Sequence, residues 1–221
     1  MTRPVITIPK RMHRFLSADW HIDVRSQQAG VNLSGVVVSG ATNFPRWVAE
    51  PSFVFYRTDL ATWQGIIAHL QGMFGIIRMP MLNPVATYAV PKEPKDGVTF
   101  GNGQSFSSGV GFLFDPFVVC EGGSAKGATS MTVSGDVAPV VGQIMSRNDW
   151  PFRVTSVTEA ASGSWDITFQ MPLREAIADQ DRISHFGYGL FELTEDQSGR
   201  VSYTANHHGR PSLSLREALN R

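Results

Sequence analysis

One segment of this sequence has the apolar spacing of an amphipathic helix, and strand-like segments lie on both sides of it. Apolar residues recur at the i, i+3, i+4, i+7 spacing of one helical face, at Trp63, Ile66, Ile67, Leu70 and Phe74. Thr58 and Asp59 provide a cap and a first-turn acid, and glycines at 72 and 75 end the pattern. The sequence therefore predicts one helix over about residues 58–73, whose apolar face packs on a neighbouring sheet.

Period-two alternation precedes this helix. Residues 36–39 read as a strand, and the breaker Asn43-Phe44-Pro45 follows them. Beyond the breaker, one side of an extended chain would carry Trp47, Ala49, Pro51, Phe53 and Phe55. We expect a half-buried β-hairpin here and a further strand at 76–79, directly after the helix.

The second half of the chain has short apolar runs that are interrupted by turn residues. Strands are predicted at 130–133, 143–145, 152–157, 165–169 and 189–194. Turn signals every 8 to 12 residues or so are typical of a small barrel or sandwich. The fold class expected is therefore mainly β, with one flanking helix and a second small β-barrel or β-sandwich domain.

Domain boundaries are suggested by a long segment, residues 83–109, that is rich in glycine and proline and has little periodicity. We expect a first domain at 1–108, an inserted small β-domain at 109–186, and a returning strand with a C-terminal tail at 187–221. In that tail, Ser214 and Glu217 have the spacing of a capping box and predict a final short helix on the surface.

Charge composition argues against several partners. The chain has 19 basic and 19 acidic residues, so the basic surplus that would favour stable nucleic-acid binding is missing. No apolar run reaches the roughly 20 residues that span a bilayer, and the N-terminus lacks a secretory signal, so we expect a soluble, non-secreted chain without membrane insertion. Lys occurs only at positions 10, 92, 95 and 126. Because Arg is enriched and Lys depleted in protein interfaces, this bias favours an assembly subunit.

Two polar motifs could carry chemistry. Residues 122–127 have the spacing G-x-x-x-x-G, but position 128, where a phosphate-binding loop has its lysine, is Ala, and a strand follows, which favours an ordinary turn. Asp19, His21 and Asp23 alternate, so a strand would place them on one face. A metal site needs further converging ligands, and a solvent-exposed polar face is the simpler interpretation.

Two other candidates also favour structural roles. His207 and His208 are adjacent and would point in different directions, which favours an exposed loop. Cys120 follows three apolar residues and is expected to be buried and unreactive. No nucleophile elbow or acid–base constellation is apparent, so we expect no enzyme activity, no catalytic residues, no cofactor and no metal.

An ordered set of motifs resembles the distal tail proteins, also called baseplate-hub adaptors, of long-tailed bacteriophages. The first half contributes the strand region after Arg25, then Trp47, and the helix pattern of Trp63, Leu70, Gly72 and Phe74. The second half contributes GATSMTVSG at 127–135, Gly142, FRVTSV at 152–157, FQMPLR at 169–174 and FEL at 191–193. Together the motifs span residues 25 to 195. Gln143 and Met171 depart from the family pattern, which has an acid and a proline there.

The resemblance implies a tail-tube-like β-sandwich flanked by a helix, with a second small β-domain. It also implies a virion structural protein, assembled in the host cytoplasm as a homohexameric ring at the distal end of the tail tube. Its partners would be copies of itself, the tail tube protein and the tail tip or hub proteins. Our candidate for a subunit-interface arm is the glycine-rich segment 97–111, together with Phe100, Phe106 and Phe112.

Three alternatives remain open on the sequence. A tail terminator or connector ring at the head side would share the same features. A carbohydrate- or surface-binding β-module would display an exposed aromatic platform, such as Trp150 or Trp165. A hydrolase would require a converging polar cluster, which the sequence does not reveal.

Overall fold

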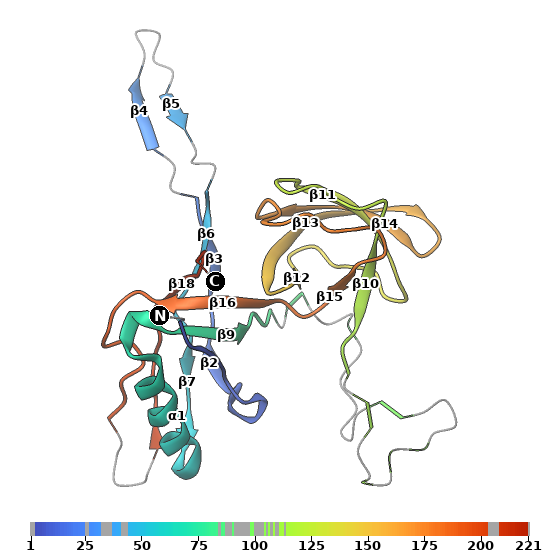
Figure 1. The fold of residues 1–221 in the computed structure, drawn as a ribbon. Helices are drawn as coiled ribbons and strands as arrows, with labels where there is room; N and C mark the ends of the chain where they lie inside the picture. The colour runs from blue at the N-terminus through green and yellow to red at the C-terminus, as the bar shows by residue number, and fades with distance from the viewer. Residues whose placement is uncertain are drawn as a thin grey trace. The chain divides into compact units, whose positions relative to one another are not determined.

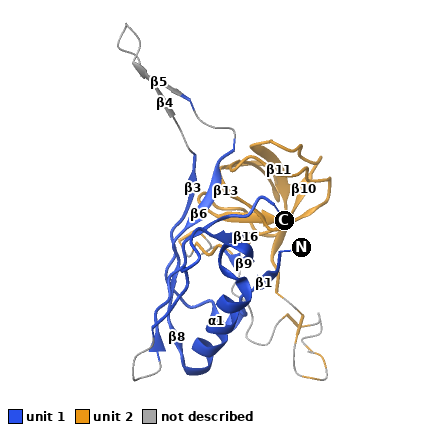
Figure 2. Cartoon of the chain, turned by 60° about the vertical axis from the view of Figure 1, so that its left-hand side comes forward, with its two compact units in different colours: residues 1–80, 189–221 blue, residues 81–188 orange. Residues whose placement is uncertain are grey.

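The computed structural model describes residues 3–24, 27–31, 37–40, 44–83, 85–86, 90, 98–99, 104, 106, 108, 111–112, 114–202 and 208–220. The chain forms two compact units (Figure 1). Unit 1 contains residues 1–80 and 189–221, and unit 2 contains residues 81–188 (Figure 2). Both units are mainly β, and the described part of the chain contains one α-helix.

Unit 1 is organised around a six-stranded mixed sheet. In spatial order its strands are β1 (Val5–Thr7), β9 (Ile76–Pro80), β16 (Tyr188–Leu193), β18 (Leu215–Glu217), β6 (Arg46–Ala49) and β3 (Trp20–Asp23). β1 runs parallel to β9, whereas β18 is antiparallel to both β16 and β6. The aromatic rings of Trp20 and Phe191 lie 5.2 Å apart between centroids and help to fill the core on one face. The predicted strand at 76–79 is confirmed as β9.

Among its described residues, unit 1 also contains three separate two-stranded sheets. They are β2 (Phe15–Ser17) with β7 (Ser52–Phe53), β8 (Phe55–Tyr56) with β17 (His208–Gly209), and β4 (Gln27–Val31) with β5 (Val37–Gly40). A short 3-10 helix, η1 (Lys10–Met12), lies between β1 and β2. β3 and β6 are antiparallel neighbours, so the chain runs out along β3 and β4 and returns along β5 and β6.

The alternation predicted between residues 47 and 55 is confirmed. Trp47, Ala49, Phe53 and Phe55 are each at most 1% exposed, and Pro51 is also buried. β6, β7 and β8 follow one another almost without interruption, so successive odd-numbered residues keep pointing to the same side. The period-two pattern therefore identified a single buried face that runs through three short strands.

The predicted helix is present as α1 (Arg57–Leu70), followed by the 3-10 helix η2 (Gly72–Phe74). The predicted start and end differ from those observed. Its N-cap is Tyr56, which makes no side-chain capping bond, so Thr58 is not the cap. At the other end Gln71 takes the left-handed conformation, with φ of 52°, and stops the helix before Gly72. Phe74 is consequently off the buried helical face and is 36% exposed.

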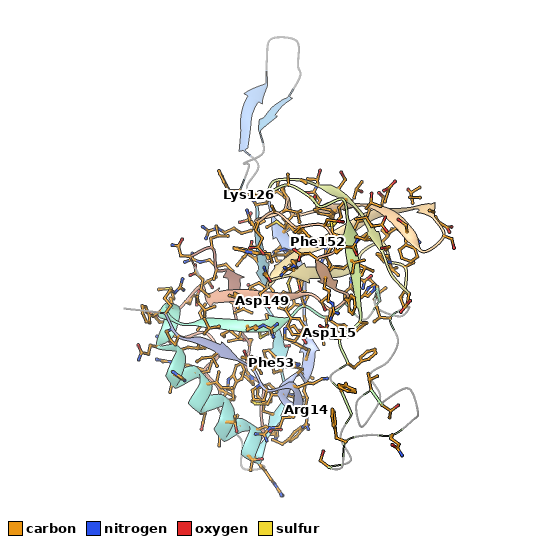
Figure 3. The ribbon with its side chains drawn as sticks, turned by 45° about the vertical axis from the view of Figure 1, so that its right-hand side comes forward. Arg14, Phe53, Asp115, Lys126, Asp149 and Phe152 are labelled. Carbon is orange, nitrogen blue, oxygen red and sulfur yellow. The ribbon has the colours of Figure 1, made fainter. Side chains whose placement is uncertain are left out.

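α1 packs on β7 and β8 through an aromatic cluster. The ring centroid of Trp63 lies 5.2 Å from that of Phe53 and 5.0 Å from that of Phe55. Its Nε1–H donates to the carbonyl of Gly199 at 2.8 Å, so the buried indole nitrogen is satisfied. Figure 3 labels Phe53 within unit 1, and Figure 1 shows α1 alongside β7.

Leu70 at the end of α1 provides a stability test of this packing. Its side chain is fully buried, and a Cβ built on Gly75 would lie 2.7 Å from Leu70 Cδ2. We expect Leu70→Ala to lower the free energy of unfolding of unit 1 by about 2–5 kcal/mol, because a cavity replaces the side chain. Urea denaturation followed by circular dichroism measures this loss. Gln64→Ala, on the exposed face of the same helix, should change it by less than about 0.5 kcal/mol; equal losses would contradict the assignment.

The predicted C-terminal helix is wrong. Residues 215–217 form strand β18, which pairs with β16 on one side and with β6 on the other. Leu213, Leu215 and Glu217 are each at most 1% exposed, so their alternation buries one face of a central strand. The capping-box spacing of Ser214 and Glu217 was outweighed by pairing with strands far away in the sequence. This segment is thus part of the core of unit 1 and not a surface tail.

Unit 2 contains a closed, entirely antiparallel barrel. Around the barrel its strands are β10 (Phe117–Glu121), β11 (Ser130–Ser134), β14 (Ser164–Gln170), β13 (Trp150–Ala161), β12 (Ile144–Arg147) and β15 (Arg182–Ser184), and β15 pairs again with β10. Closure leaves no free edge strand in the barrel. Of the two architectures left open for this half, the barrel is the one observed.

The barrel interior is filled by apolar side chains from all six strands. Its core includes Val118, Cys120, Met131, Val133, Met145, Phe152, Val154, Ile167, Phe169, Leu173, Ile177 and Ile183. The rings of Phe152 and Phe169 pack with centroids 4.7 Å apart (Figure 3 labels Phe152). An interior filled in this way is typical of a six-stranded barrel, which leaves no room for a channel.

In the sequence, the barrel unit interrupts unit 1. β9 and β16 are neighbours in the six-stranded sheet, yet the whole of unit 2 lies between them in the sequence. The units meet at residues 80/81 and 188/189, whereas the sequence analysis placed boundaries at 108/109 and 186/187. Among the described residues, no helix has the length and apolarity needed to cross a membrane.

Candidate functional site

The proposed interface arm contains exposed aromatic side chains. Phe106 and Phe112 are 44% and 45% exposed, and their rings meet edge to face at 4.9 Å between centroids. Val98, itself 38% exposed, exchanges two backbone hydrogen bonds with Phe112, of 2.9 and 2.7 Å. We call Val98, Phe106 and Phe112 the aromatic patch. Phe100, the third predicted aromatic of the arm, lies outside the described residues.

The aromatic patch has the chemistry of a protein interaction surface. Exposed phenylalanine rings lose unfavourable contact with water when a partner covers them, and aromatic side chains are enriched in interfaces. Two rings that already pack on each other need little further ordering on binding, because part of their side-chain entropy has been lost. Phe106 and Phe112 both belong to the predicted arm, and the structure places their rings in contact; their role as an interface stays a prediction.

Several of the arginines that suggested an assembly subunit form ion pairs inside unit 1. Glu192 on β16 accepts from Arg3 and from Arg216, each at 2.7 Å. Burial raises the pKa of Glu192, but hydrogen bonds from the two guanidinium groups outweigh it and the pKa is lowered overall. Arg11 and Arg14 lie 3.4 and 3.7 Å from the carboxylate of Asp59. Part of the arginine bias is thus structural.

A buried polar pair lies at one end of the barrel. Gln143 and His185 are at most 1% exposed although both are polar. The Gln143 amide nitrogen donates to the backbone carbonyl of His185 at 2.9 Å and contacts His185 Nδ1 at 3.0 Å. The Gln143 carbonyl oxygen accepts from the backbone N–H of Val140 at 3.0 Å, which fixes the orientation of the amide. This network joins the turn before β12 to the residue that follows β15.

His185 also lines an open pocket of unit 2 with a volume of about 420 Å³. The segment leading into β10 contributes Phe114, Asp115 and Phe117, and the turn after β11 contributes Asp136. Asp115 accepts a hydrogen bond from the Ser184 hydroxyl at 3.0 Å, and Figure 3 labels it. Pockets of this size commonly bind small molecules through apolar walls and a few polar groups.

His185 gives the barrel a defined pH dependence. Burial lowers the pKa of His185 below 6.5, while the backbone of Val137 and the charge of Asp115 act in the opposite direction. The folded barrel therefore stays neutral at His185 over a range just below about pH 6.5, where the unfolded chain already binds the proton. We expect the free energy of unfolding of unit 2 to fall as the pH drops through this range.

His185→Asn tests this expectation, because asparagine keeps an acceptor for Gln143 and removes the titration. In urea unfolding, the stability advantage of the wild type over the variant should be smaller at about pH 5.5 than at about pH 7.5. Barrel-specific NMR signals should be used, because burial also lowers the pKa of His13 in unit 1. A difference independent of pH would show that His185 is not responsible.

The polar motifs weighed on the sequence do not converge in the structure. His21 and Asp19 are exposed on or next to β3, with 3.8 Å between His21 Nδ1 and the Asp19 carboxylate. No group of three or more potential metal ligands occurs among the described residues. His208 pairs with Tyr56 in the β8–β17 ladder, and His207 lies outside the described residues.

Cys120 and the glycine-rich motif have structural positions. Cys120 is fully buried in the barrel, and burial raises the pKa of its thiol, as expected for an unreactive cysteine. The motif at 122–127 forms the turn between β10 and β11, with positive φ at Gly122, Gly123 and Gly127. Trp150 and Trp165 are half-buried, so neither is the exposed platform that a surface-binding module was expected to show.

Sequence reasoning missed the polar pocket. Gln143 and His185 are 42 positions apart, and nothing in their local patterns indicates that they meet.

A comparison with known proteins adds no assignment, because no protein-family model matches the chain and no curated protein gives a significant match.

Proposed function

We propose that this chain is a structural subunit of a bacteriophage tail, which forms a ring at the distal end of the tail tube and connects the tube to the tail tip or baseplate hub. The proposal rests on the ordered motifs between residues 25 and 195 that resemble distal tail proteins. The structural observation that best supports it is the barrel inserted between adjacent strands β9 and β16 of a helix-flanked β unit. A helix-flanked β-domain with a second small β-domain is the arrangement that the resemblance implies.

A homohexameric ring is the assembly we propose. Ring closure requires heterologous contacts, in which one surface of a subunit meets a different surface of its neighbour. The aromatic patch is our candidate for one of these two surfaces, because its phenylalanine rings are exposed and cluster together. The tail tube protein and the tail tip or hub proteins are the further partners in this proposal.

In this proposal the protein acts by its geometry and catalyses no reaction. A potentially reactive side chain considered in the sequence analysis, Cys120, is buried in the barrel core, where it has a structural role. Cofactors and metals have no role in the proposed function.

Localisation within virions provides the test. An epitope tag on this chain should appear by electron microscopy as a ring around the tail axis, at the end distal to the head. Deleting the gene should produce incomplete, non-infectious tails. A tag at the head side would favour a terminator or connector ring, and a chain absent from particles would overturn the proposal.

A matched pair of variants tests the aromatic patch. Changing Phe106 and Phe112 together to Ser should abolish ring formation in tails, because the apolar contact is lost. Phe44→Ser, which alters a side chain that is 72% exposed elsewhere in the chain, should leave the rings intact. Rings that form normally with the double variant would exclude the patch as an interface.

A further inference from the structure

The neutral net charge of the chain is divided unequally between the two units. Unit 2 contains 7 of the 19 basic residues and 11 of the 19 acidic residues, so its formal net charge is −4. The remaining 12 basic and 8 acidic residues give unit 1 a net charge of +4. Every copy therefore has a positive unit and a negative unit, and unit 1 of one copy attracts unit 2 of another.

The positive charge of unit 1 is concentrated in residues 10–14, which we call the basic segment. No other window of five residues in the chain has three basic residues, here Lys10, Arg11 and Arg14. The side chains of Arg11 and Arg14 are 64% and 52% exposed, and they lie 3.4 and 3.7 Å from the carboxylate of Asp59. One carboxylate cannot neutralise three cations, and exposed ion pairs of this kind are weak. The basic segment can therefore bind a further anionic group.

The pocket of unit 2 offers carboxylates to such a cation. Asp115 precedes β10 and Asp136 follows β11, and both exposed residues line the pocket, whose volume is about 420 Å³. Asp115, labelled in Figure 3, accepts from the Ser184 hydroxyl at 3.0 Å, which orients its carboxylate. The described residues that line the pocket include no Lys or Arg. His185 is buried and its ring interacts with the backbone of Val137, so the two carboxylates are the groups that select a ligand.

An arginine side chain fits this pocket better than other charged groups do. Anions are repelled by the two carboxylates. A guanidinium group is a planar cation with five N–H donors, and it is less strongly hydrated than the ammonium group of lysine, so it pairs well with carboxylates. Its methylene stem can lie along apolar walls, which Phe114 and Val137 provide here. The pocket thus has the chemistry of a site for an arginine side chain of a protein.

We propose that the pocket of one copy binds an arginine side chain of the basic segment of a neighbouring copy. The contact is heterologous, because unit 1 of one copy meets unit 2 of the next, as closure of a ring requires. Phe112 of the aromatic patch lies three positions before Asp115, so the pocket adjoins in sequence the surface already proposed as an interface. The inference deepens the proposed function and rests on it for the ring, whereas the contact itself is measured in solution.

Cross-linking of the full-length chain tests the contact directly. Carbodiimide joins lysine amines to carboxylates, and the chain has four lysines, of which Lys10 alone lies in unit 1. An equal mixture of ¹⁴N- and ¹⁵N-labelled chains, at about 1 mM and low salt, should give links from Lys10 to Asp115 or Asp136. Linked peptide pairs with mixed isotopes show that the link joins two copies. Salt at about 0.5 M should lower the yield of these links several-fold, because it screens exposed charges.

Charge reversal in two variants tests the pairing. Arg11→Glu and Asp136→Arg should each lower the association constant about tenfold, as measured by sedimentation equilibrium. An equal mixture of the two variants should regain association, because the reversed segment of one then meets the reversed pocket of the other. Arg200→Glu and Glu159→Arg make the same charge changes at exposed positions elsewhere, and should lower the constant by at most about twofold.

The outcomes distinguish this contact from its alternatives. Links from Lys10 that join only peptides of the same isotope would place the contact inside one chain and overturn the proposal. The same conclusion follows if the mixed variants do not associate although circular dichroism shows both to be folded, or if variants and controls lose equally. If a variant does not fold, the cross-links of the wild type decide.

Failure of the proposed function gives a different pattern. A chain absent from phage tails whose mixed-isotope links persist would overturn the proposed function and leave this contact established. A tail ring that forms normally from the Asp136→Arg variant, in a protein without mixed-isotope links, would overturn this contact alone.

Discussion

A chain that ends at residue 212 is expected to lose the fold of unit 1 and to keep the barrel. β18 lies between β16 and β6, where Leu215 is paired with Leu193 on one side and with Ala49 on the other. Its deletion removes both ladders, together with the buried side chains of Leu213 and Leu215. Losing several buried side chains, at about 2–5 kcal/mol each, costs an amount comparable to the whole unfolding free energy of a typical protein, about 5–15 kcal/mol.

Two-dimensional NMR spectra measure this outcome residue by residue. Signals from the barrel should keep their wild-type positions, while those of β3, β6 and β9 should collapse to the narrow dispersion of an unfolded chain. A control chain that lacks only residues 220 and 221 should retain both units, because Asn220 is exposed and Ala218 is the last buried residue of the described chain. Intact unit 1 signals in the longer truncation would show that β18 is dispensable.

The barrel is expected to fold without the rest of the chain. Residues 114–187 contain all six of its strands, and closure pairs β10 with β15 at the two ends of this segment. Its core is built from side chains of the same segment. The isolated segment should unfold in one cooperative transition with a free energy on the order of 5 kcal/mol.

Calorimetry and NMR test the barrel together with its complement. Replacing residues 81–187 by a short glycine-serine linker should leave unit 1 folded, because β9 and β16 are already neighbours in its sheet. Within the isolated barrel, Phe152→Ala should cost about 3–5 kcal/mol and abolish the transition, whereas Glu159→Gln should have almost no effect. An unfolded segment 114–187 would mean that the barrel depends on unit 1.

Local patterns predicted the elements whose burial follows their own periodicity. The alternation from Trp47 to Phe55 and the helix spacing of Trp63 and Leu70 each mark a face that the structure buries. The strands at 130–133, 152–157 and 165–169 lie within β11, β13 and β14. In these segments the local preference and the tertiary environment agree, so the sequence is sufficient.

Elements set by distant pairing could not be predicted in this way. Ser214 and Glu217 have the spacing of a helix cap, but the segment is a strand because it pairs with β16 on one side and with β6 on the other. β10 has a nearly continuous apolar run, and β15 has three residues, so neither shows a distinctive period. Strand order and barrel closure likewise depend on partners far apart in the chain.

The candidate sites show the same division. Phe106 and Phe112 were assigned to one candidate arm because they lie six positions apart in or next to the glycine-rich segment 97–111, but their ring contact comes from the structure. The pairing of Gln143 with His185 required the barrel to bring β12 and the end of β15 together. No spacing rule connects two such positions, so the pocket became visible only in three dimensions.

The insertion of unit 2 also sets the order in which the protein can form during synthesis. β6 and β9 leave the ribosome early, but their neighbours β16 and β18 come only after the whole of unit 2. At about 5 to 20 residues per second, translation of residues 81–188 delays those strands by roughly 5 to 20 s. The later-made barrel can thus close first, while Trp47 and the rest of the early apolar face still lack β16 and β18, although β3 and β1 are already present as neighbours of β6 and β9. The N-terminal segment is therefore the part of the nascent chain with the greatest need of chaperone protection.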